Sequence, residues 1–110
     1  MEKDNIAYFH LILDATRKIR EYLGEINFDN FLADGKTQSA VIMQIQIIGE
    51  LSKKIPEEMK SEINVPWKEI VGLRDMVSHD YFSLDIEAIW NTATKDVPDL
   101  ESKIKKYLNL

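Results

Sequence analysis

The sequence contains no cysteine, which excludes disulfide bonds, thiolate metal sites and a cysteine nucleophile. Glycine and proline are scarce, with four and three residues in a chain of 110, and this argues against a turn-rich all-β fold. No apolar run approaches the roughly 20 residues that a membrane-spanning helix needs. The N-terminus has no apolar segment behind a basic start, so we expect no signal peptide, no membrane association and a cytoplasmic location.

Basic residues are also in the minority. The 14 Lys and Arg residues are outnumbered by 19 Asp and Glu residues, which gives a formal net charge of −5. Binding to nucleic acid depends strongly on cations that neutralise phosphates, so an acidic chain must rely on a local basic surface. The candidate clusters are Arg17, Lys18 and Arg20, and Lys103, Lys105 and Lys106. Each of them is more often just a solvated helix face.

What the sequence does contain is a series of helical patterns. Apolar residues recur at helical spacing in four long segments, and glycine or proline punctuates the chain between them. We predict long helices over residues 5–23, 37–55, 67–79 and 83–107, a helical turn near 28–31 and a short helix over 57–63. The predicted architecture is all-α, a single domain over residues 1–110 that forms an up-and-down bundle of four to five helices.

Particular residues are expected to begin, bend or end these helices. Asp4 is placed to cap the first helix and Gly24 to end it. Ser83 is placed to cap the last long helix. Pro98 removes the backbone hydrogen bond to Thr94, so we expect it to bend that helix rather than end it.

The segment over residues 37–55 is ambiguous, because it is rich in β-branched residues and alternates like a strand over 43–47. Its length favours a helix, since a usual strand has about five or six residues. Apolar residues lie on more than one of its faces, which is typical of a helix buried on more than one side. The second stripe, through Ala40, Met43 and Ile47, is a candidate contact with another subunit.

Two histidines are the residues most suited to proton transfer near neutral pH. His10 lies four residues before Asp14, which predicts a surface ion pair rather than half of a metal site, because no second histidine is near. His79 lies four residues after Asp75, so the two share a helix face. The carboxylate and the helix C-terminus both favour imidazolium, which suits His79 to general acid–base catalysis.

Arg74 offers a planar, permanently charged group suited to phosphate. It precedes His79 by five residues, about 140° around an ideal helix, so one regular helix does not aim both at one atom. A fraying helix end, or a second copy in a dimer, would bring them together more easily. The purely structural alternative is that His79 and Asp80 cap the helix, Arg74 makes a surface ion pair, and Tyr81 and Phe82 pack in the core.

Arg74, His79 and Tyr81 together spell an Arg-x4-His-x-Tyr motif. Its surroundings include Val65-Pro66-Trp67 at the start of the helix and Ile89-Trp90 in the helix that follows. In this motif and setting the sequence resembles HEPN-domain proteins and, among them, the HepT-like toxins. The resemblance extends over nearly the whole chain.

The resemblance implies an α-helical homodimer whose motifs meet at the interface, and an endoribonuclease that needs no metal or cofactor. HepT-like toxins are partnered by an MntA-type nucleotidyltransferase antitoxin, which transfers AMP onto the motif tyrosine. Carried over, Arg74 would stabilise a charged phosphorane, His79 would act as general acid or base on RNA, and Tyr81 would accept AMP. Asp75 and Ser78 would support them, with Asp75 orienting His79.

Three functions stay open on the sequence. The first is a ribonuclease toxin that acts through Arg74 and His79. The second is a non-catalytic module that binds a nucleotidyltransferase, forming a stable complex and becoming modified on Tyr81. The third is a nucleotide-sensing bundle that holds a phosphate without reaction. Cleavage of RNA in the presence of chelator distinguishes the first from the other two.

Overall fold

The computed structural model describes residues 3–79 and 85–110, with backbone alone for residues 73, 74 and 76–79. Every regular element in these ranges is helical, which confirms the all-α prediction. The elements are α1 (Lys3–Leu23), α2 (Phe28–Leu32), α3 (Gly35–Lys54), α4 (Glu57–Lys60), α5 (Trp67–His79), α6 (Ile86–Asn91), the π-helical segment η2 (Thr92–Asp96) and α7 (Val97–Tyr107).

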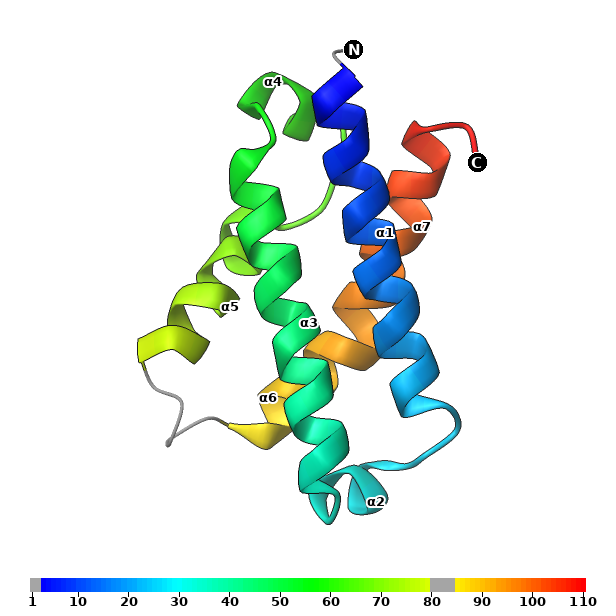
Figure 1. Ribbon diagram of the computed structural model, residues 1–110, viewed down its shortest axis with the longest axis vertical. Helices are drawn as coiled ribbons and strands as arrows, with labels where there is room; N and C mark the ends of the chain where they lie inside the picture. Colours follow the sequence, from blue (N-terminus) through cyan, green and yellow to red (C-terminus); the bar gives the residue numbers. More distant parts are fainter. Residues whose placement is uncertain (1–2, 80–84) are drawn as a thin grey trace.

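Helix α3 is the centre of the arrangement (Figure 1). It runs antiparallel to α1 on one side and packs against α5 on the other, while α7 packs against α1. The short helix α2 closes the end of the bundle where α3 begins, and it contacts both α3 and α6. Within the described ranges, none of the helices is both long and apolar enough to cross a membrane.

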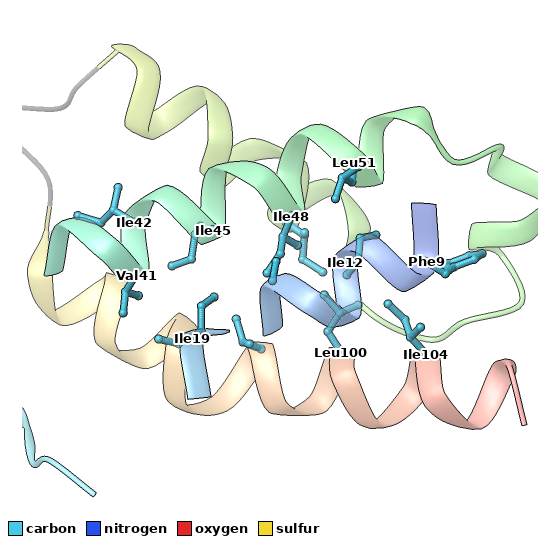
Figure 2. Packing of buried hydrophobic residues seen from close by; sticks show 14 of the residues in the cluster. Phe9, Ile12, Ile19, Val41, Ile42, Ile45, Ile48, Leu51, Leu100 and Ile104 are labelled. Carbon is cyan, nitrogen blue, oxygen red and sulfur yellow. The ribbon is translucent and has the colours of Figure 1, made fainter. Parts of the chain in front are cut away.

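The core is built from the apolar stripes of the long helices (Figure 2). Large side chains from three of them are almost completely enclosed, among them Phe9, Ile12, Ile19, Val41, Ile45, Ile48, Leu100 and Ile104. Each such side chain stabilises the fold by about 1.5–3 kcal/mol relative to an exposed one. The segment over residues 37–55, which is rich in β-branched residues, is helical. Helical spacing places its isoleucines together in this core.

Two predicted helix caps were wrong. Asp4 lies inside the first turn of α1, because the helix already begins at Lys3. A carboxylate in the first turn still interacts favourably with the helix dipole. Helix α6 begins after Asp85, whose carboxylate accepts hydrogen bonds from the backbone N–H of Glu87 and Ala88. Ser83, the predicted cap, lies outside the described residues.

The other predicted punctuation agrees with the structure. Gly24 ends α1 with a φ of +52°, and its N–H donates to the carbonyl of Arg20. The irregularity expected from Pro98 takes the form of the π-helical segment η2, which directly precedes α7. Pro98 has no N–H to donate to the carbonyl of Thr94. The Thr94 hydroxyl makes a separate hydrogen bond, in which it donates to the carbonyl of Trp90 at 2.7 Å.

The short helix α2 confirms the helical turn predicted near residues 28–31. The Asn27 side chain caps it by accepting a hydrogen bond from the backbone N–H of Asn30. Phe31 is fully buried, and its ring centre lies 5.2 Å from that of Trp90. This aromatic contact joins α2 to α6.

Candidate functional site

Helix α5 carries four of the five residues predicted for the site: Arg74, Asp75, Ser78 and His79. Its bounds agree with the predicted helix over 67–79. Tyr81, the fifth, lies outside the described residues. The backbone thus places an arginine and a histidine on the second half of one helix.

The start of α5 is firmly held. The indole N–H of Trp67 lies 2.9 Å from the carbonyl oxygen of Lys60 and 3.1 Å from that of Ile63, so it links α5 to the segment before it. The carbonyl of Pro66 accepts a hydrogen bond from the N–H of Ile70, whose side chain is buried. These hydrogen bonds fix the start of α5, and the helix packs against α3.

The helix sets the angular relation between the site positions. An α-helix has about 3.6 residues per turn, so positions 75 and 79 share a face and positions 74 and 79 lie about 140° apart. Asp75 is exposed to solvent. Since the backbone is helical through His79, a single copy of α5 presents the arginine and histidine positions on different sides.

The basic cluster predicted on α1 is neutralised by acidic neighbours. Arg17 pairs with Asp14 and Glu21, and Lys18 also pairs with Asp14. The hydrogen bonds from Arg17 and Lys18 lower the pKa of Asp14. A paired cation is a poor anchor for a phosphate, because binding must first displace its carboxylate.

The cluster on α7 is partly neutralised in the same way. Lys103 pairs with Asp99 and donates to the carbonyl of Asn64, whereas Lys105 and Lys106 are exposed. Glu101 from α7 pairs across to Arg20 of α1 at 3.3 Å. The two clusters therefore do not form a continuous basic surface.

The predicted ion pair of His10 with Asp14 is absent from the ion pairs of the described residues, because Asp14 is engaged by Arg17 and Lys18. His10 is exposed and borders a shallow pocket of about 280 Å³ between α1 and α7. In the described part of the chain, no three histidine or acidic side chains come together as metal ligands would.

A group of lysines that the sequence patterns did not single out lies at the other side of the bundle. A pocket of about 330 Å³ is lined by Lys53, Glu57, Lys60, Trp67, Lys68 and Val71. These residues come from the end of α3, from α4 and from the start of α5. The three lysines of this pocket are not close together in the sequence, and only the fold brings them together.

The second stripe of α3 is left uncovered by the chain itself. The side chains of Met43 and Ile47 are 55% and 37% exposed, while their neighbours Ile42 and Ile48 are buried. A large contiguous apolar patch on a protein surface marks a contact, whereas single exposed apolar side chains are common. The position of a second subunit on α3 stays a prediction.

Comparison with known proteins adds an independent observation. A family model described as "Ribonuclease HepT-like" matches residues 12–107. The chain is 40% identical over 107 residues to the "Probable ribonuclease HepT" of Thermococcus cleftensis, covering 96% of this chain and 97% of the relative. It is 36% identical over 102 residues to the "Putative RNase TTE0752" of Caldanaerobacter subterraneus subsp. tengcongensis, covering 92% and 91%. No solved structure matches the chain.

Proposed function

Since the chain belongs to the HepT-like ribonuclease family, we propose that it is a metal-independent endoribonuclease that uses Arg74 and His79 of two copies in a dimer. The observation that carries the proposal is the Arg-x4-His-x-Tyr motif with its arginine and histidine on one regular helix. The family membership supplies the reaction class, and the names of the relatives agree with it. The cytoplasm is the proposed location.

The chemistry requires little more than these two groups. RNA carries its own nucleophile in the 2′-hydroxyl. One histidine takes the 2′-OH proton as the oxygen attacks phosphorus, and the other protonates the departing 5′-oxygen. Arginine stabilises the extra negative charge of the phosphorane. The bond from phosphorus to the 5′-oxygen breaks, and the products are a 2′,3′-cyclic phosphate and a 5′-hydroxyl.

The proposed dimer answers the geometric difficulty of the single helix. Arg74 and His79 occupy positions about 140° apart on α5, so a two-fold axis near this helix would set the arginine of one copy beside the histidine of the other. The exposed apolar residues Met43 and Ile47 of the neighbouring α3 support such a contact. Asp75 orients His79 in this scheme, and Ser78 contributes to the polar surroundings.

We further propose regulation by a partner protein. An MntA-type nucleotidyltransferase antitoxin would transfer AMP onto Tyr81, two residues after His79, and the pair would form a toxin–antitoxin system. A bulky anion next to Arg74 would block the RNA phosphate by its size and its charge. This part of the proposal rests on the motif tyrosine and on the family.

The deciding experiment is cleavage of cellular RNA in EDTA by unmodified protein, after its intact mass has been checked. We expect cleavage by the wild type, products with cyclic phosphate ends, and at least a hundredfold loss in His79→Ala and in Arg74→Ala. Glu58→Ala, an exposed position on α4, serves as the control and should cleave normally. Cleavage that survives in His79→Ala would contradict the assignment.

A second candidate function has one specific observation in its favour. The chain is acidic and its α1 cluster is engaged in ion pairs, which leaves little basic surface for RNA. A non-catalytic module that binds a nucleotidyltransferase, or a nucleotide, would need no such surface. Dimeric, unmodified wild type that fails to cleave RNA yet forms a stable complex with a nucleotidyltransferase would favour this reading.

A further inference from the structure

The lysine pocket at the junction of α3, α4 and α5 has the charge of an anion site. It brings together Lys53, Lys60 and Lys68 with a single carboxylate, that of Glu57. In Figure 1 these three helices meet on the opposite side of the molecule from α7. Trp67 and Val71 form an apolar wall beside the lysines. The pocket thus has both the cations that attract a phosphate and a surface against which a ribose or base can lie.

Lys60 holds a fixed positive charge in this pocket. Its side chain is 7% exposed, and its ammonium donates to the carbonyl of Ser52 at 3.1 Å. Its ion-pair partner Glu57 is 92% exposed, and such a solvated carboxylate contributes little. Lysine is rarely buried unless its charge is well compensated. The Lys60 ammonium has three N–H donors. One donates to the carbonyl of Ser52 at the end of α3, and a second faces the solvated carboxylate of Glu57.

Lys53 and Lys68 differ from the basic residues of α1. Both are exposed, and neither forms an ion pair with any described residue, whereas Arg17, Lys18 and Arg20 all do. Their charges therefore remain available to a ligand. Capping of α3 by Lys60 gives no reason for these two further lysines to border the same pocket.

Gly72 lies on α5 between Lys68 and His79. It lies in the interior of the helix, where glycine is less stable than alanine. It is exposed, and no described atom lies within 4 Å of where its Cβ would be, so packing does not require glycine. Positions 68, 72, 75 and 79 follow one face of the helix, and an absent side chain in this row lets another chain approach the backbone closely.

We propose that the lysine pocket binds a phosphate of the RNA substrate a few nucleotides away from the bond that is cut. This inference rests on the proposed ribonuclease function. Position 68 precedes position 79 by eleven residues, which is about three helical turns and about 16 Å along the same face of α5. The RNA strand runs along this face, over Gly72, from the lysines to the site of His79. Asp75 adds one negative charge to the path, so the lysines supply the main attraction.

The test measures binding and cleavage separately. Binding of a fluorescent single-stranded oligoribonucleotide is followed by anisotropy in the His79→Ala background, in which the RNA stays intact. Adding Lys53→Glu and Lys68→Glu should weaken binding at least tenfold and, for one lost phosphate contact, make the slope of log affinity against log salt shallower by about 0.7. Both positions are exposed, so the fold should persist. Lys53→Gln with Lys68→Gln, a milder change, should weaken binding in the same direction.

Lys105→Glu with Lys106→Glu is the matched control, because it makes the same change of charge on the exposed face of α7. This control should retain most of the binding. In the presence of His79, the Lys53 and Lys68 variants should raise KM for the oligonucleotide and leave kcat/KM for a dinucleoside monophosphate unchanged. That short substrate cannot reach from the reaction site to the pocket.

Several results would overturn the inference. One is equal weakening by the pocket and control variants, and another is no weakening by the pocket variants. Displacement of the oligonucleotide by a modest excess of AMP would make the pocket a mononucleotide site instead. The proposed function fails separately: binding that depends on Lys53 and Lys68, without any cleavage by the wild type, would leave an RNA-binding pocket on a protein that is not a ribonuclease.

Discussion

The hydroxyl of Thr16 lies 2.8 Å from Glu101 Oε2 and 2.9 Å from the carbonyl of Leu13. Its single proton can serve only one of them at a time, and a carboxylate is the stronger acceptor. Thr16 is buried in α1 and Glu101 belongs to α7, so this hydrogen bond joins the two helices. Arg20 reaches the same carboxylate oxygen from the solvent side at 3.3 Å.

The contact between Thr16 and Glu101 predicts a loss of stability in acid. Burial raises the pKa of Glu101, but the hydrogen bonds from Thr16 and Arg20, together with the positive charges of Arg20 and Lys105, lower it by more, so the pKa is below its usual value. A carboxyl with a lowered folded-state pKa adds stability above its unfolded pKa of about 4.3, and this stability is lost as the pH falls through the folded value. Urea unfolding of Glu101→Gln should therefore depend less on pH below about 5 than that of the wild type.

Glu58→Gln is the control for this measurement, since Glu58 is exposed on α4. It should keep the pH dependence of the wild type. If Glu101→Gln and Glu58→Gln showed the same pH dependence, the hydrogen-bonded carboxylate would have no special role in acid stability.

The cap of α6 predicts that substitution of Asp85 lowers stability more than substitution of Ser83. Asp85→Ala removes the acceptor for two backbone N–H groups and should lower the free energy of unfolding by about 1 kcal/mol. Ser83→Ala should change it by no more than about 0.5 kcal/mol. Chemical denaturation of the two variants measures both values, and a larger loss in Ser83→Ala would reverse the assignment of the cap.

Ile47 and Ile48 are adjacent in α3, and we expect substitutions at the two positions to affect dimerisation and folding, respectively. Ile48→Ala empties part of the core and should destabilise by about 2–5 kcal/mol, because Ile48 is buried. Ile47→Glu changes an exposed side chain and should leave the monomer folded, yet shift the proposed dimer toward monomer. Light scattering across a dilution series measures the second effect. A dimer unaffected by Ile47→Glu would place the subunit contact elsewhere.

Gly72→Ala predicts a gain of stability with a loss of function. A methyl group here meets no described atom and favours the helix by about 0.5–1 kcal/mol. If RNA lies over this part of α5, the added Cβ should weaken oligonucleotide binding several-fold while the melting temperature rises by a few degrees. Gly35→Ala, near the start of α3 and also without a neighbour at its Cβ position, is the control. Equal RNA binding in both variants would argue against the path over Gly72.

The helices were largely predictable because their signals are local. Pro66 and the apolar spacing after it predicted the bounds of α5, and Gly24 predicted the end of α1. The caps were harder, because several polar residues near a helix start can serve and the choice depends on where the chain enters. This is why Ser83 rather than Asp85 was predicted as the cap.

The helix that carries the candidate site was predictable for the same reason. The spacing of Arg74 and His79 on one helix is a sequence property, and α5 extends through both. The lysine pocket was not predictable, since Lys53, Lys60 and Lys68 are separated by seven and eight residues and meet only once α3, α4 and α5 are packed. The neutralisation of Arg20 was equally hidden, because its partner Glu101 lies 81 residues away in the chain.

The central place of α3 constrains how the sequence of this helix can evolve. One side of α3 fills the core, another holds α5, and the stripe of Met43 and Ile47 faces outward. Neighbouring codons in this helix therefore come under different selection, and the pressures repeat with the helical turn. We expect a library of random α3 variants to separate into three groups: those that do not accumulate, those that accumulate without pairing, and those that pair without activity.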